Sequence, residues 1–258
     1  MTEKVKETLP KGTEEEFKSL LLAISDTKLL LGYHFGEWTF RTPSLESGIA
    51  TCNFAQDELG HVRLFHGLLK NHLDESDSTL IHDRPAENYN SVICLNSNIS
   101  SWLELITFSA VIDGGVTILL ESMSNSSFRP LRERVGKILQ EEKFHSDYTD
   151  AWVTSLAIDA KGGSELVGDV FKKAVPAFAN WLKKLNTSKL IESGVLKTSL
   201  EESLGSSFNK FETLAKNAGL DLPDLRGIAS DDGADYLQQP QEEIIYSLRG
   251  EKNVVFRV

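Results

Sequence analysis

The sequence predicts an all-α protein whose core is a four-helix bundle made of two helical hairpins. Three observations support this prediction. Apolar residues recur at three- and four-residue steps along four long segments. A polar, turn-rich stretch at residues 73–100 separates the first two segments from the last two. The glycine patterns of nucleotide-binding folds and the G-x-S-x-G elbow are absent. Two hairpins joined by a long crossover have the connectivity of a ferritin-like bundle.

The first predicted helix spans about residues 14–40. Thr13 and Glu16 have the spacing of a capping box, in which each side chain accepts a hydrogen bond from the backbone of the other. Residues 41–44 end the helix with a proline-containing turn. The apolar stripe has one gap and consists of Phe17, Leu20, Ile24, Leu31, Phe35 and Trp38.

The remaining core helices are predicted at about residues 45–69, 102–123 and 131–157, with residues 73–100 as the crossover. The C-terminal part predicts a helix at 164–185, interrupted or kinked near Pro176, and another at 198–216. The tail from Leu220 has no assigned element, and residues 253–258 fit a short strand or a disordered terminus. We expect a single domain over 1–258, with the four-helix core at 14–160 and C-terminal helices and tail at 161–258.

Charge and cysteine content narrow the class of protein. The 258 residues include 27 Lys and Arg against 38 Asp and Glu, a net charge of −11. Such an acidic chain is a poor nucleic-acid binder, because phosphate neutralisation needs a basic face. Two cysteines are too few for a disulfide framework. We find no signal-peptide apolar region and no run of 18 apolar residues, so we predict a cytoplasmic protein without a membrane span.

Two Glu-x-x-His motifs carry the predicted chemistry. Glu58 and His61 lie in the second helix, and Glu142 and His145 lie in the fourth. At a spacing of three residues, both side chains of a pair project from one helix face and can bind the same metal. Two such pairs on alternate helices of a four-helix bundle are typical of dinuclear metal sites.

Both pairs interrupt an apolar stripe, so they face the core. The second-helix stripe is Phe54, Glu58, His61, Phe65 and Leu68. The fourth-helix stripe is Leu131, Val135, Ile138, Glu142, His145, Thr149 and Trp152. Buried charges must be paired or bind metal. The pattern therefore favours a metal site, and the alternative is a buried hydrogen-bonded polar network.

A dinuclear site also needs a carboxylate from the first and third helices. The turn between the third and fourth helices centres near residues 127–128, so the neighbour of Glu142 lies about 14 residues before it. This position is Asp113, within the stripe Ile106, Ala110, Asp113, Val116 and Leu120. Glu121 is the competitor, but it lies roughly 12 Å nearer the turn at 1.5 Å per residue.

The first hairpin places a lysine where a carboxylate is expected. Its turn centres near Pro43 and Glu58 lies 15 residues past it, so the partner is at 28 or 29. Lys28 fills the gap in the first apolar stripe. Glu37 is the nearest acid toward the turn, and we interpret it as structural. We predict that Lys28 modifies or replaces a metal ligand.

Several segments resemble the phenylacetyl-CoA oxygenase (epoxidase) family, in its members PaaA and PaaC. They are SDTKLLLGYHFGEWTFRTPSLESGIATCNFAQDELGHVRL, VIDGGVTILLES and QEEKFH, and the similarity covers about residues 14–185. The resemblance implies a ferritin-like fold. It also implies the metal ligands Glu58, His61, Asp113, Glu142 and His145, the set that the helix stripes indicate.

The resemblance implies two hypotheses about function. In this family PaaA uses a di-iron centre and O2 to epoxidise the ring of phenylacetyl-CoA, and PaaC is a structural paralogue that pairs with PaaA. The chain is therefore expected to be either an oxidoreductase, the monooxygenase component itself, or a non-catalytic PaaC-like partner with a degenerate site. DTKLLLG and EW are similar to PaaC, whereas DELGH keeps the catalytic pattern. An iron-storage or peroxide-scavenging relative fits the fold but not these motifs.

Cofactor and partners follow from the same resemblance. The expected cofactor is iron, as one or two ions, with manganese as an alternative. The expected partners are other oxygenase subunits or a second copy, an acyl-CoA substrate and a reductase component. Three carboxylates and one lysine carry a charge of about −2, which balances one divalent ion, so we expect at most one tightly bound metal per chain.

Overall fold

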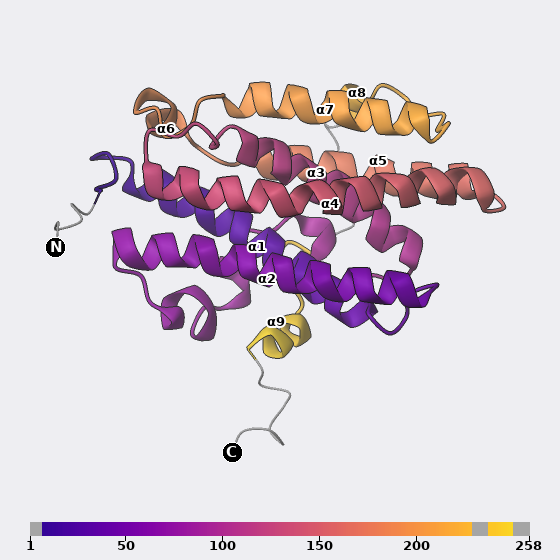
Figure 1. Cartoon of the computed structure of the whole chain (residues 1–258), viewed down its shortest axis with the longest axis horizontal. Coiled ribbons are helices and arrows are strands. Elements are labelled where there is room, and N and C mark those ends of the chain that lie inside the picture. The colour runs from indigo at the N-terminus through magenta and orange to yellow at the C-terminus, as the bar shows by residue number, and fades with distance from the viewer. Residues whose placement is uncertain (1–6, 229–236, 250–258) are drawn as a thin grey trace, which may run out of the picture.

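The computed structural model describes residues 7–228 and 237–249, and these residues form helices and turns without any strand. Four long helices make the core (Figure 1): α1 (Glu14–Trp38), α2 (Leu45–Leu73), α3 (Trp102–Glu121) and α4 (Arg129–Asp159). α1 packs along α2 and α3 packs along α4. The all-α fold and the ferritin-like arrangement of two hairpins are confirmed.

The crossover between the hairpins is fastened to α1. It contains a π-helical turn (Ser78–His82) and two 3-10 turns (Ala86–Asn88 and Ile93–Leu95). Arg84 donates to both carboxylate oxygens of Asp26, at 2.6 and 2.7 Å, and the backbone N–H of Asn90 donates to the same carboxylate at 2.7 Å. Both of these side chains are buried. The crossover therefore holds α1 in place two residues before Lys28.

The C-terminal helices cover the second hairpin. They are α5 (Gly163–Lys183), α6 (Ser188–Glu192), α7 (Leu200–Asn217) and α8 (Leu225–Ile228). α5 and α7 lie against α3, and α5 continues as a helix through Pro176. Gly115 permits this packing, because a Cβ there would lie 2.4 Å from the Phe178 ring. Residues 186–199 hold the short α6, which the sequence did not predict.

The last described helix, α9 (Glu242–Leu248), packs on the first hairpin, away from α7 and α8 (Figure 1). Its Ile245 is buried with Leu29 and Val62 in a small apolar cluster. The sequence had no assignment for this segment. The strand or disordered end predicted for residues 253–258 lies outside the described residues.

The predicted core stripes are buried, with one exception. The predicted apolar and motif positions of α1, α2 and α3 are all at most 9% exposed. In α4 the stripe is buried from Leu131 to Thr149, but Trp152 is only half-buried, against Trp102. The helices also extend past the predicted limits, since α2 continues to Leu73 and α4 begins at Arg129.

The predicted capping box at the start of α1 is wrong. Thr13 is the N-cap residue, but its side chain makes no cap hydrogen bond, and its hydroxyl donates to the carbonyl of Pro10 instead. The Glu16 carboxylate accepts hydrogen bonds from the backbone N–H groups of Lys189 and Leu190. Glu16 is thus committed to the first turn of α6, a tertiary contact that local spacing does not reveal.

α3 alone among the described helices is long and apolar enough, by length and composition, to cross a membrane. In the structure 78% of that apolar stretch is buried. α3 packs against α1, α4, α5 and α7. Its hydrophobicity is therefore that of a central core helix.

The fold predicts a loss of stability in mild acid. Burial lowers the pKa of His34 and of His66 to about 4, below the value near 6.5 expected in an unfolded chain. The unfolded state therefore binds more protons between pH 6.5 and 4. We expect the free energy of unfolding to fall by about 1.4 kcal/mol per pH unit for each histidine, measured by urea titration between pH 6.5 and 5. His34→Gln, which can still donate to the Leu95 carbonyl, should remove about half of this slope, and an unchanged slope would contradict the assignment.

Candidate functional site

Six polar side chains meet in the middle of the four-helix core. Lys28 comes from α1, Asp113 from α3, and a Glu-x-x-His pair from each of α2 and α4. All are at most 3% exposed. We call this group the ion cage; its members are Lys28, Glu58, His61, Asp113, Glu142 and His145. The structure thus brings together every site residue predicted from the sequence.

Lys28 is the centre of the ion cage. Its Nζ lies 3.0 Å from Glu58 Oε2, 2.8 Å from Asp113 Oδ1 and 2.7 Å from Glu142 Oε1, and its side chain is fully buried. The ammonium has three N–H donors, so each can serve one carboxylate. One lysine on α1 thereby joins carboxylates from the three other core helices.

The two histidines point their Nδ1 atoms into the ion cage. His61 Nδ1 lies 3.1 Å from Glu142, and His145 Nδ1 lies 3.4 Å from both Asp113 and Glu58. Thr117, one turn after Asp113 on α3, donates to Glu142 Oε2 at 3.0 Å. Each carboxylate is therefore held by the lysine and by at least one further polar group.

Two residues that sequence reasoning missed hold the outer nitrogens of the histidines. Asp57 of α2 lies 3.3 Å from Nε2 of His145 on α4, and Glu141 of α4 lies 2.9 Å from Nε2 of His61 on α2. Each acid thus binds the histidine of the opposite helix. The available signal is the doubled acid in DE-x-x-H and EE-x-x-H, because Asp57 and Glu141 each precede the motif glutamate.

The electrostatics of the ion cage favour charged partners throughout. Burial alone would lower the pKa of Lys28, but Asp113, Glu142 and Glu58 outweigh burial and raise it well above the ordinary value. Burial also opposes protonation of the histidines. The neighbouring carboxylates nevertheless raise the pKa to about 9 for His61 and to about 11 for His145. At neutral pH three cations face three carboxylates, and the ion cage is neutral by itself.

The carboxylates differ in how well they are compensated. Burial raises the pKa of Asp113, but Lys28 and His145 together hold it far below the ordinary value. For Glu142, burial and the nearby charge of Asp113 outweigh the effect of Lys28, so its pKa is raised. Glu142 is therefore the cage carboxylate nearest to taking up a proton.

The donor set could hold a metal ion, but not together with Lys28 in its present place. Glu58, Asp113, Glu142 and His145 each offer one ligand atom, and these atoms lie within 4.8 Å of one another. The Lys28 ammonium contacts three of these four groups at 2.7–3.0 Å. A divalent ion bound to the same oxygens would meet a like charge in a buried site. The residues therefore do not fit a two-metal centre, and they fit one ion only if Lys28 moves.

The competing acids and the other histidines described lie outside the ion cage. Glu37 and Glu121 are exposed on α1 and α3, as expected for residues displaced toward the turns. His34 is buried with its Nε2 2.8 Å from the carbonyl of Leu95. His66 is buried on α2.

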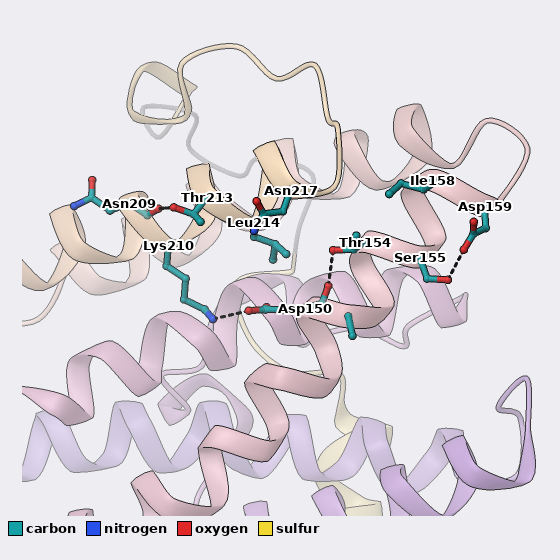
Figure 2. A pocket seen from close by; sticks show the side chains of 11 residues that line it. Asp150, Thr154, Ser155, Ile158, Asp159, Asn209, Lys210, Thr213, Leu214 and Asn217 are labelled. Atoms are coloured by element: carbon teal, nitrogen blue, oxygen red, sulfur yellow. Dashed lines mark hydrogen bonds and ion pairs between the residues drawn. The ribbon is translucent and has the colours of Figure 1, made fainter.

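A surface groove of about 800 Å³ lies between α4 and α7 (Figure 2). Lys210 reaches from α7 to Asp150 on α4, at 3.1 Å, and to Ser146 at 2.6 Å. The methylenes of Lys210 pass close over Gly114, where a Cβ would lie 2.6 Å from Cε. The groove is thus closed off at Lys210 and does not include the six residues of the ion cage.

Fold and site together define a ferritin-like protein with a carboxylate–histidine centre into which a lysine has been placed. The family described as phenylacetic acid catabolic protein matches residues 1–250, and the chain belongs to this family. It is similar to the C-type subunit of the 1,2-phenylacetyl-CoA epoxidase of Escherichia coli (strain K12), with 23% identity over 155 residues. The match covers 60% of this chain and 61% of the relative, about three fifths of each.

The site predicts that Lys28 stabilises the fold without any metal. Lys28→Met would leave three buried carboxylates without their shared cation, and breaking a buried ion pair in this way costs about 3–5 kcal/mol. We expect a loss of that size in urea unfolding at pH 7 with EDTA present. Lys18→Met, on the exposed side of α1 where Lys18 pairs with Glu75, is the control and should cost less than about 1 kcal/mol. Equal losses for the two variants would contradict the role of Lys28.

Proposed function

We propose that the chain is a partner subunit of a phenylacetyl-CoA epoxidase-type oxygenase in aerobic phenylacetate catabolism. In this proposal its own centre is a metal-free ion cage. The observation that carries the proposal is the position of Lys28 Nζ, within 3.0 Å of a carboxylate from each of the other three core helices. O2 activation and ring epoxidation of the acyl-CoA would then take place in a sister subunit supplied with electrons by a reductase component.

The family and the relative support this proposal. The chain belongs to the phenylacetic acid catabolic proteins, and the relative is the C-type subunit of an epoxidase. A neutral ion cage keeps the four core helices in register without a cofactor. This would suit a subunit that shapes or stabilises a complex in the cytoplasm.

A second candidate function is that of the oxygenase subunit itself, with one bound iron or manganese. The observation in its favour is that both Glu-x-x-His pairs and Asp113 are retained, with four ligand atoms within 4.8 Å. In this alternative Lys28 would swing out of the ion cage when the ion enters.

Metal analysis combined with activity separates the two candidates. The purified chain would be loaded anaerobically with Fe(II), desalted and analysed for iron. It would then be assayed for epoxidation of phenylacetyl-CoA with a reductase, alone and with a sister subunit of the same family that has glutamate in place of Lys28. We expect less than 0.1 iron per chain and activity only in the mixture. One iron per chain with activity in the absence of the sister subunit would replace the proposal by the second candidate.

The charge argument makes a further prediction about stoichiometry. Lys28→Glu removes the competing cation and supplies the fourth carboxylate, so metal binding should rise toward two ions per chain. Isothermal titration with Mn(II) would measure it. His61→Ala in the Lys28→Glu background should lower the uptake again. Two tightly bound ions in the native chain would show that the charge argument is wrong.

A further inference from the structure

One broad face of the molecule has no covering element among the described residues. α2 and α4 lie side by side at the front of Figure 1, with the other core helices behind them. They are antiparallel neighbours, because Asp57 pairs with His145 and His61 pairs with Glu141. We call the outward sides of these two helices the α2–α4 face.

Large apolar side chains stand out from the α2–α4 face. Phe144 of α4 is 72% exposed, and Leu45 and Ile49 of α2 are 77% and 56% exposed. The pairing of the helices places Phe144 level with residues 57–60 of α2. An exposed phenylalanine in the middle of a helix contributes little to the fold of its own chain, and such residues mark interaction sites when they lie together.

Glycines make the same face shallow. Gly60 and Gly67 are seven residues apart on α2, so they share one side of the helix. A Cβ at Gly67 would meet nothing within 4 Å, and a Cβ at Gly60 would meet only the end of Arg63. Each glycine costs about 1 kcal/mol relative to alanine in a helix, and no close contact within the described residues requires it. A partner that approaches the α2 backbone would give both glycines a use.

The charge of the α2–α4 face is opposite to that of the whole chain. The exposed charged residues of the two helices are six basic and four acidic, whereas the chain has 27 basic and 38 acidic residues. The basic ones are Arg63, Lys70, Arg129, Arg132, Lys137 and Lys143, and the acidic ones are Glu46, Glu133, Asp147 and Asp159. This excess of positive charge favours an acidic partner surface.

We propose that the α2–α4 face docks a second, different helical subunit through an acidic face of that subunit, with Phe144 as the central anchor. The inference rests on the proposed function, which requires a sister subunit. A second copy of this chain fits less well, because a twofold contact would place the same basic face against itself. Docking would also cover Asp57 and Glu141, whose side chains are 38% and 32% exposed while they hold the histidines of the ion cage.

The test is a binding measurement with a matched pair of variants. The full chain is titrated with a purified sister subunit of the same family that has glutamate in place of Lys28, by calorimetry and sedimentation. We expect a one-to-one complex that weakens as salt rises from about 0.1 to 0.5 M. Phe144→Asp should weaken binding at least tenfold. Leu166→Asp, which changes a 54% exposed residue on α5, should bind like the unchanged chain.

A second readout reports on the face directly. Cys52 is half-buried on α2 and Cys94 is buried, so a thiol reagent should modify Cys52 first. Bound sister subunit should slow this reaction at least fivefold in the unchanged chain but not in Phe144→Asp, whose fold is checked by its melting temperature. Equal binding by the two aspartate variants, no complex at all, or a self-association that Phe144→Asp abolishes would each overturn the docking proposal. A complex that forms as expected but makes no epoxide would leave the docking site in place and count against the proposed function.

Discussion

The buried ammonium of Lys28 is the interaction on which the bundle centre depends. It reaches one carboxylate on each of the other three core helices, so the relative heights of all four helices are set at one point. The low polarity of the interior makes each contact strong and makes any loss expensive. The neighbours of the lysine fit this requirement. The inward nitrogens of His61 and His145 supply the remaining positive charge, and their outward nitrogens are held by acids of the opposite helix. The centre is therefore complete with protein groups alone.

Structure outside the centre keeps Lys28 where it is. Asp26, half a turn earlier on α1, is clamped by Arg84 of the crossover. Glu16, three turns earlier, binds the start of α6. α1 is thus fixed by the chain that follows α2 and by the chain that follows α5. Because the ion cage tolerates little misalignment, these two attachments connect distant segments of the sequence to the geometry of one amine.

The sequence predicted the helical core and the membership of the ion cage, because both follow from periodicity. Polar residues within apolar stripes had to be buried, and counting from the two hairpin turns placed Asp113 and Lys28 level with Glu142 and Glu58. What it missed depends on contacts between segments that are far apart. The spacing of Thr13 and Glu16 suggested a capping box, yet Glu16 is used by α6. Asp57 and Glu141 looked like surface acids, since their histidine partners lie across a helix interface. α9 has too few residues for its periodicity to stand out.

The two halves of the centre are nearly related by a twofold exchange of the hairpins. α2 and α4 carry matching motifs, and each supplies the acid that holds the histidine of the other. In this arrangement Lys28 occupies in the first hairpin the place that Asp113 occupies in the second. A lysine codon becomes a glutamate codon by one base change in its first position. A chain with a closed, self-neutral centre and a chain with four carboxylates therefore stand one point mutation apart. After a gene duplication, two copies of such a protein could divide the tasks of scaffold and catalyst without passing through an unfolded intermediate.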